Sequence, residues 1–377
     1  MAKSEGRKWE STEAKWREEG RPVDIRGGAI QLGDMKPTTC CFLSLLSALL
    51  IFPRGGAADP VKVFILAGQS NMVGHGKVEM GLSPTYKEGD PGHQREIKGG
   101  IGGLRHLATN PATAKRYRHL LGKEGEWVER DDVWIHSTAP GKSDGRLTVG
   151  FGKGNWFGPE LQFGHRVGDF LDEPVLIIKT AWGGHSLGIR FRPPSSGKPN
   201  YEKTNDKDED VGTSYREMVR IVQEICKNPG SRFPELEGRE VEIAGFGWHQ
   251  GWNDAGSREM VDEYAANMAN LIRDLRKDLG VKDLPVVIAN TGMIGMEATG
   301  IRAELCEIQL KMADAKVMPE FAGTIAAIET RPFARPADQS PSGFGYHWNH
   351  NAESHFLLGD AMGEAMVELL KKSLSGR

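Results

Sequence analysis

Cysteine is scarce in this sequence, with four cysteines in 377 residues. Cys40 and Cys41 fall in an apolar stretch near the N-terminus, which leaves only Cys226 and Cys306 in the rest of the chain. One disulfide between these two is possible, but each lies in a segment with helical apolar spacing, which favours two separate buried thiols. The chain has neither a pair of CxxC motifs nor an HExxH helix, so we expect no metal and no other cofactor.

An excess of positive charge is also missing. The formal net charge is -3 and the sequence pI is about 6.4. No basic face is evident that would neutralise a phosphate backbone, so we do not expect nucleic acid as a partner. With 38% hydrophobic and 26% charged residues, the composition is that of a soluble globular protein long enough to bury a sizeable core.

The long hydrophobic run lies in the segment from Met35 to Ala58, which reads MKPTTCCFLSLLSALLIFPRGGAA. One lysine, an apolar run and small residues before Asp59 predict an export signal over 35–58, and hence a secreted or periplasmic protein without stable membrane association after cleavage. Because such signals open a chain, we interpret residues 1–34 as a mis-assigned N-terminal extension. A membrane anchor or buried helix is the alternative, although the run is shorter than the ~20 residues of a span.

Short apolar runs alternate with helical patterns through residues 59–377, which we interpret as a single domain. This alternation predicts an α/β fold, a three-layer α/β/α sandwich of flavodoxin-like type with a five-stranded parallel sheet. A glycine-rich, charged stretch at 75–156 interrupts the rhythm and is interpreted as a substrate-side insertion. The expected strands are Val61–Ala67, Val175–Ala181, Val241–Trp248, Pro285–Thr291 and Ala322–Ile328; the expected helices begin near Pro159 and Ser214 and cover Ser257–Leu279 and Asn351–Lys372.

Ser70 is the candidate nucleophile. It follows the first expected strand in LAGQSNMVGHG, where the chain turns out of the sheet between glycines and a hydroxyl would be exposed. In open α/β sheets, ligands collect outside the carboxyl ends of the strands, which is where this serine falls. A serine at such a junction is also a common helix cap, and the motif alone does not decide between the two roles.

The next strand ends supply candidate groups for binding an oxyanion. Gly183 and Gly184 in KTAWGGHSL would let a backbone N–H approach a ligand, although a tight turn also explains them. Gln250 and Asn253 in GWHQGWNDA offer neutral amide donors at the same sheet edge. Alternatively, Asn253 and the neighbouring Asp254 form a turn and cap the following helix.

Histidines gather before the last expected helix, in SPSGFGYHWNHNAESHF. His347 lies on the loop that enters this helix, and a neutral imidazole there could take the serine proton and return it to a leaving alcohol. A metal site formed by His347, His350 and His355 is the rival interpretation. Surface roles suffice for His350 and His355.

The ordered set of serine, glycine, amide and histidine resembles the SGNH (GDSL-like) hydrolases. Within them it is similar to the sialate O-acetylesterase and carbohydrate esterase family six group, through AGQSNMVGHG, AWGGHSL, WHQGWND and GYHWNHNAESHFLLGDAMGEAM. The resemblance covers nearly all of the chain after the export signal. It implies Ser70 as nucleophile, His347 as base, and an oxyanion hole from the Ser70 N–H, the Gly184 N–H, and Asn253 or Gln250.

Two positions depart from the family pattern. Trp252 stands where many members have glutamate, so no role of that carboxylate carries over. Phe344 stands three residues before His347, where the family usually has the acid of the triad. Asp338 on the same loop is our first choice for the acid and Glu329 the second; a Ser/His dyad without an acid is the third possibility.

The resemblance implies an exported carbohydrate O-acetylesterase that acts on an acetylated carbohydrate through a Ser/His acyl-enzyme mechanism. Trp127, Trp134, Trp156 and Trp182 could stack on sugar rings, although Trp134 and Trp182 are also explained as core residues. Two alternatives remain open. One is a catalytically inactive carbohydrate-binding protein on the same fold, and the other is an esterase for lipids or small aryl esters.

Overall fold

The computed structural model describes residues 58–79, 100–199 and 208–375. The predicted extension 1–34 and the predicted export signal, up to residue 57, lie outside the described residues. None of the helices in the three described ranges combines the length and the apolar character that a membrane span requires.

A seven-stranded sheet forms the centre of the described part of the chain, with the strand order β3-β2-β4-β1-β5-β6-β7. All neighbouring strands run parallel except β3, which pairs antiparallel with β2 at one edge. The α/β prediction is confirmed, and each of the five predicted strands is present. The sheet has seven strands, however, so the predicted strand number of five was wrong. The strands are β1 (Val61–Gly68), β2 (Val133–Ser137), β3 (Asp144–Arg146), β4 (Val175–Ala181), β5 (Val241–His249), β6 (Val286–Ala289) and β7 (Ile325–Ile328).

The two unexpected strands lie inside the stretch predicted as an insertion. β2 has the sequence VWIHS and pairs along its whole length with β4, and all five of its residues are buried. A histidine and a serine interrupt its apolar character, so it lacks the continuous aliphatic run expected of a buried parallel strand. β3 is only three residues long and partly exposed, which leaves no pattern to detect.

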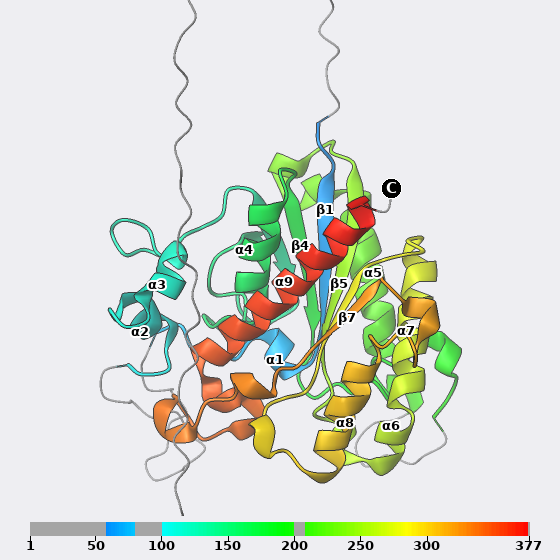
Figure 1. Ribbon diagram of the computed structural model, residues 1–377. Coiled ribbons are helices and arrows are strands. Elements are labelled where there is room, and N and C mark those ends of the chain that lie inside the picture. The colour runs from blue at the N-terminus through cyan, green and yellow to red at the C-terminus, as the bar shows by residue number, and fades with distance from the viewer. Residues whose placement is uncertain (1–57, 80–99, 200–207, 376–377) are drawn as a thin grey trace, which may run out of the picture. The chain divides into compact units, whose positions relative to one another are not determined.

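Helices cover both faces of the sheet and confirm the three layers (Figure 1). α4 and α9 pack on one face together with α1, and α5, α7 and α8 pack on the other. The helices are α1 (Ser70–Val73), α2 (Leu104–Thr109), α3 (Ala114–Tyr117), α4 (Glu160–Phe170), α5 (Thr213–Lys227), α6 (Arg258–Asp262), α7 (Tyr264–Leu279), α8 (Gly300–Lys311) and α9 (Ala352–Ser375).

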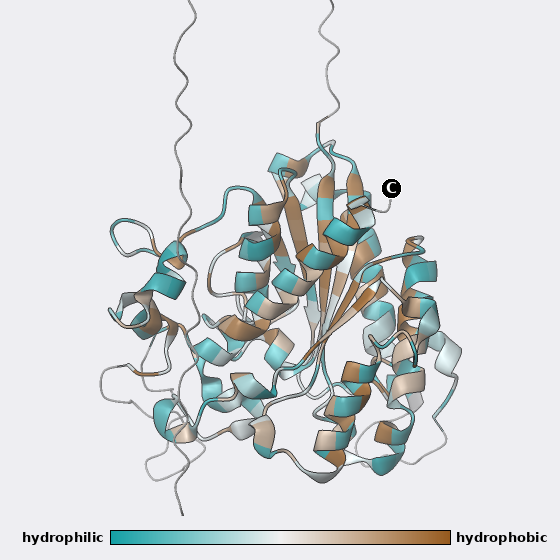
Figure 2. Ribbon diagram, viewed as in Figure 1, coloured by the Kyte–Doolittle hydropathy of each residue, from teal (hydrophilic) through white to brown (hydrophobic). Residues whose placement is uncertain are grey.

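Strand β1 shows why the core has two sides. Val63 and Ile65 belong to the apolar cluster under α5 and α7, whereas Phe64 and Leu66 belong to the cluster under α4 and α9. Successive side chains of a strand point to opposite faces, so a strand covered on both faces is mostly apolar. Figure 2 shows this as brown strands beneath helices whose outer sides are teal.

The last helix packs tightly on α4 because glycines line the contact. A Cβ on Gly359 would lie 2.3 Å from the carbonyl oxygen of Pro159, and one on Gly363 would lie 2.6 Å from Cβ of Arg166. Neither position has room for a larger residue. The start of α9, and with it the loop that carries His347, is thereby held at a fixed place over the sheet.

Several local predictions have clear outcomes. Cys226 and Cys306 are both free thiols, as expected; Cys306 is buried, but Cys226 is only partly buried, so the prediction of two buried thiols was wrong for Cys226. The single helix predicted over Ser257–Leu279 was wrong, because it divides into α6 and α7 at Glu263. Its ends are confirmed: the Ser257 side chain caps the first turn, and Gly280 ends α7 with a positive φ of 70°.

Candidate active site

Ser70 is the first residue of α1, directly beyond the end of β1. Gly68 allows β1 to approach β5 closely here, since a Cβ on it would lie 2.1 Å from the carbonyl oxygen of His249. The residue before the helix is Gln69, and no side-chain hydrogen bond caps the helix. The helix-cap interpretation of Ser70 is therefore wrong, and its hydroxyl is left for chemistry.

A cavity of about 610 Å³ opens at this end of the sheet. It brings together four of the predicted site residues, Ser70, Gly184, Asn253 and His347. No carboxylate is among the described residues that line it, and Lys153 is the lining residue with a permanent charge. The full lining is Gln69, Ser70, Val73, His75, Thr138, Pro140, Lys153, Ala181, Trp182, Gly183, Gly184, Trp252, Asn253, Tyr346 and His347.

The loop carrying His347 has an unusual backbone. Trp348, Asn349 and His350 follow it with φ angles of 48°, 56° and 60°, in the left-handed region that side chains disfavour by about 1–3 kcal/mol each. Hydrogen bonds hold this turn: the Asn349 N–H donates to Phe344 O at 2.9 Å, and Trp348 Nε1 donates to a backbone carbonyl at 3.3 Å. Such strain persists only where its surroundings impose it, and here it sets where His347 projects.

Asn71 connects the segments that carry Ser70 and His347. Its fully buried side chain donates from Nδ2 to the backbone oxygen of Tyr346 at 3.1 Å. Asn71 follows Ser70 and Tyr346 precedes His347, so one hydrogen bond joins the neighbours of the candidate nucleophile and the candidate base. No hydrogen bond joins Ser70 Oγ to His347 itself among the described residues.

Gln69 organises the amide donors, a role that the sequence analysis missed. Its Nε2 donates to Asn253 Oδ1 at 3.1 Å, and its Oε1 accepts from Gln250 Nε2 at 3.2 Å and from the backbone N–H of Gly251 at 3.2 Å. Because Gln69 binds the side-chain oxygen of Asn253, the donor Nδ2 of Asn253 is left free to face the cavity. The only sequence signal was the position of a glutamine directly before Ser70.

Asn253 and Gln250, the two alternatives for the amide donor, differ in their surroundings. Gln250 is buried, and its Nε2 already donates to Gln69, to the His185 carbonyl and to Asp254. Asn253 lines the cavity, and a methyl group on Gly184 would lie 3.8 Å from its Nδ2. Asn253 therefore fits the oxyanion role, whereas Gln250 fits a structural one.

Asp254 lies behind these donors as a fully buried carboxyl group. It accepts hydrogen bonds from the backbone N–H groups of Leu187 at 3.0 Å and Gly188 at 2.8 Å. Burial raises its pKa to about 6, against the lowering effect of these bonds. The group thus ties the loop after β4 to the loop after β5, which carry Gly184 and Asn253.

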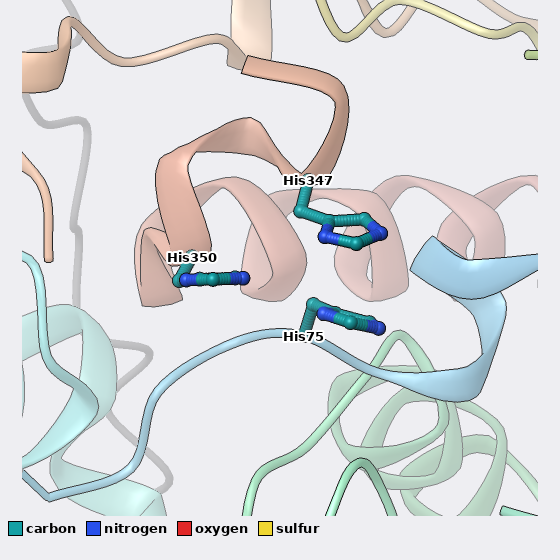
Figure 3. Close-up of side chains that lie close together, drawn as sticks. All are labelled: His75, His347 and His350. Atoms are coloured by element: carbon teal, nitrogen blue, oxygen red, sulfur yellow. The ribbon is translucent and has the colours of Figure 1, made fainter. Parts of the chain in front are cut away.

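Three histidines form a cluster beside the cavity (Figure 3). The rings of His75 and His347 stack with centroids 3.7 Å apart and planes at 24°, and His350 lies 5.6 Å from each. Burial lowers the pKa of His347 to about 4 and that of His350 to about 3. Burial also lowers the pKa of His75 well below its usual value, so all three imidazoles are neutral at neutral pH, which suits a general base.

Among the described residues, this cluster is also the group whose side chains could hold a metal ion, because one nitrogen from each ring lies within 4.8 Å of the others. A lone pair lies in the plane of its ring, however, and the rings of His75 and His347 lie face to face. Their lone pairs do not meet at the ~2.0–2.1 Å needed for zinc, so the arrangement does not fit a bound ion. The surface roles expected for His350 and His355 were wrong, since both are buried.

Neither candidate acid reaches His347 in the structure. Asp338 lies exposed in the short turn Ala337–Gln339 and does not line the cavity. Glu329 is engaged elsewhere: it forms an ion pair with Arg331 and accepts from Asn290 Nδ2 at 3.0 Å. No carboxylate forms a hydrogen bond or ion pair with His347 among the described residues.

A family model of carbohydrate esterases, sialic acid-specific acetylesterases, matches residues 60–368. The chain belongs to this family. This confirms the resemblance seen in the sequence and makes the protein a hydrolase of ester bonds on carbohydrates. A comparison with curated proteins gives no match.

Several solved structures are similar to this carbohydrate esterase. One is a protein from Arabidopsis thaliana, with 18% identity and a TM-score of 0.49, covering 82% of this chain and 99% of that one. Another is a carbohydrate acetylesterase from Xanthomonas citri, with 16% identity, a TM-score of 0.47 and coverage of 81% and 55%. A third is a family 2 carbohydrate esterase with a carbohydrate-binding domain from Corynascus thermopiles, with 14% identity, a TM-score of 0.40 and coverage of 84% and 68%.

The aromatic residues of the esterase divide by location. Trp182 and Trp252 line the cavity, and the Arg302 guanidinium covers Trp252 at 4.5 Å. Trp156 is not among the residues that line the cavity, and its ring lies 5.0 Å from the ring of His350. Trp134 is buried in β2, which leaves its core interpretation standing. Trp127 lines a separate cavity.

Proposed function

We propose that this carbohydrate esterase removes acetyl groups from a sugar or polysaccharide, with Ser70 as nucleophile and His347 as general base. The observation that carries the proposal is that one cavity is lined by a serine free of a capping role, a neutral imidazole, and amide donors presented by Gly184 and Asn253. Chemically, these are the groups that acyl transfer requires.

In the proposed reaction, Ser70 Oγ attacks the acetyl carbonyl carbon while His347 takes the hydroxyl proton. The oxyanion forms opposite three donors, namely the backbone N–H of Ser70, the backbone N–H of Gly184 and Asn253 Nδ2. The Ser70 N–H is available because the first residues of a helix have no helical acceptor. His347 then protonates the departing sugar oxygen, and water attacks the acyl-enzyme with the same base to release acetate and restore Ser70.

We propose a Ser/His dyad in which ring stacking takes over the orienting role of a triad acid. The acid normally holds the imidazole in one orientation. Here the buried His75 ring lies against one face of His347, and the Tyr346 ring approaches at 4.5 Å with an angle of 62°. Packed rings of this kind stabilise one another by about 0.5–1.5 kcal/mol, which restricts rotation of the base.

Two observations favour the carbohydrate esterase over the two alternatives. The cavity lining includes the polar side chains of Gln69, Thr138, Lys153 and Asn253, and its apolar residues include the aromatic rings of Trp182, Trp252 and Tyr346. A lipid esterase needs a mainly aliphatic lining. An inactive binding protein does not require a base held by three consecutive strained residues, and that strain supports catalysis over binding alone.

The test is acetate release from acetylated xylans, sialic acids and algal polysaccharides by the wild type and by Ser70→Ala. We expect the variant to lose nearly all turnover while its circular dichroism stays unchanged, with the exposed Ser143→Ala as matched control. A fluorophosphonate probe should label Ser70 in the wild type, because only an activated serine reacts. Equal turnover by wild type and Ser70→Ala would refute the mechanism, and sugar binding without labelling would indicate the inactive binding protein.

We also propose that the esterase is exported by the signal predicted at 35–58, on the sequence pattern alone. Acetylated polysaccharides are encountered outside the cell, which suits this location. Sequencing the N-terminus of the protein from a culture supernatant should give a start near Asp59. Retention in the cell with an intact segment 35–58 would contradict export.

A further inference from the structure

A second cavity of about 600 Å³ lies beside the active-site cavity. Two loops line both: Pro140 borders the two cavities, and Lys153 in the first is followed in sequence by Gly154 and Asn155 in the second. The loops touch, since a Cβ on Gly141 would lie 2.2 Å from the Gly154 carbonyl oxygen. A ligand that reached from Ser70 past Pro140 would therefore meet the second cavity next.

The second cavity contains an aromatic ring whose position is fixed by two charged side chains. The Arg105 guanidinium lies 4.1 Å from the centre of the Trp127 ring. Glu79 accepts hydrogen bonds from Arg105 Nε at 2.9 Å and from Trp127 Nε1 at 3.2 Å. All three residues line the cavity. Because each side chain holds the others, the group is in place before any ligand arrives.

We propose that this group is a subsite for a second sugar ring, so that the substrate is a glycan chain rather than a single acetylated sugar. This inference rests on the proposed function. A sugar ring has an apolar face that suits the partly exposed Trp127 and hydroxyl groups that suit Glu79, Arg105 and Asn155. An aliphatic occupant would instead strip water from the ion pair of Glu79 and Arg105, which is unfavourable.

The stability of the fold explains only part of the group, namely the bond that Arg105 Nη1 donates to the Gly125 carbonyl oxygen at 2.5 Å. The side chains of Arg105 and Glu79 are 33% and 46% exposed, and ion pairs this open contribute about 0–1 kcal/mol. Trp127 belongs to the fringe of the small apolar cluster formed by α2, α3 and neighbouring loops and is not part of its buried centre. A tryptophan held open at a cavity is better placed to bind than to support packing.

The experiment compares chain length. Kinetics of the full-length protein are measured with acetylated xylan, mannan and sialic acid-containing glycans, with their acetylated single sugars, and with 4-nitrophenyl acetate. We expect the wild type to favour the chain over the single sugar for the sugar it hydrolyses best. Trp127→Ala should lower kcat/KM on that chain about tenfold, through KM, and leave 4-nitrophenyl acetate unchanged; Trp127→Phe should recover part of the loss.

Arg105→Ala and Arg146→Ala give a matched pair. Both arginines lie over a tryptophan, but Arg146 covers Trp134 at 5.2 Å and lines neither cavity. Only Arg105→Ala should weaken activity on chains, and Glu79→Gln serves as a second cavity variant if Trp127→Ala misfolds. No preference for chains, or equal loss on chains and on 4-nitrophenyl acetate, would overturn the subsite. Failure of the proposed function is distinct, since Ser70→Ala would then keep its turnover.

Discussion

The ion pair between Lys179 and Glu160 offers a sharp test of how the nucleophile is held. Both side chains are 0% exposed, and Lys179 Nζ lies 2.9 Å from Glu160 Oε2. The ammonium also donates to the backbone oxygen of Val73 at 2.9 Å, at the end of the helix that Ser70 begins, and to that of Phe151 at 2.6 Å. Burial lowers the pKa of Lys179, and the pair with Glu160 opposes this.

Replacing Lys179 by methionine removes the donor for three buried acceptors. The Glu160 carboxylate keeps one bond, from the Gly158 N–H at 2.8 Å, but loses its counter-charge. Breaking a buried pair from one side costs about 3–5 kcal/mol, a large share of the roughly 5–15 kcal/mol that stabilises a domain. The matched control is Lys371→Met, whose pair with Glu368 has the similar length of 2.8 Å but is more than half exposed and contributes only about 0–1 kcal/mol.

The assay is urea unfolding followed by circular dichroism, completed as a double-mutant cycle with Glu160→Gln. Glutamine keeps an acceptor for the Gly158 N–H and adds a donor for the stranded carbonyl oxygens, so Lys179→Met with Glu160→Gln should recover about 2 kcal/mol relative to the sum of the single variants. Because the Val73 carbonyl loses its anchor, kcat should fall more than KM changes in Lys179→Met. A loss of stability no larger than that of Lys371→Met would refute the reasoning.

Two further predictions concern the base. Only the neutral form of His347 can accept the serine proton, so kcat/KM should fall only as the pH drops toward the His347 pKa of about 4. Lys153 also lowers this pKa, so Lys153→Met should move the acidic fall in kcat/KM to higher pH. A fall centred near pH 6.5 in the wild type would contradict this. His75→Ala should lower kcat about tenfold with KM unchanged, whereas His75→Phe, which keeps a ring against His347, should retain most of kcat; equal losses in both would exclude stacking as the orienting contact.

The sequence predicts the fold where the pattern is local. Mainly apolar runs locate β1, β4 and β5 within one residue at each end, because a strand buried on both faces is mostly apolar. β2 escapes this rule since His136 finds its partner only in the fold, in Asp144 of β3 at 2.8 Å. His136 breaks the apolar pattern of β2, and its ring finds a polar partner only once β2 pairs with β3.

The candidate acids show that closeness in sequence does not predict contact with His347. Asp338 was chosen for its place on the loop before His347, but Asn351 at the start of α9 donates to Ser340 Oγ at 2.9 Å and to the Gln339 carbonyl at 3.2 Å. These bonds fix the next two residues while Asp338 stays exposed. His75 shows the converse, since it lies more than 270 positions from His347 in sequence and meets it only because β1 and α9 converge at one edge of the sheet.

No carboxylate lies beside His347 among the described residues, so in the proposed mechanism more of the rate enhancement has to come from the oxyanion donors. A base with a pKa near 4 rather than 6.5 gains about 3 kcal/mol less on taking the serine proton, at about 1.4 kcal/mol for each pKa unit. One donor to the developing oxyanion is worth about 10² to 10³ in rate, a comparable amount. In the proposed mechanism, the hydrogen bonds by which Gln69 orients Asn253 therefore offset the weaker basicity of His347.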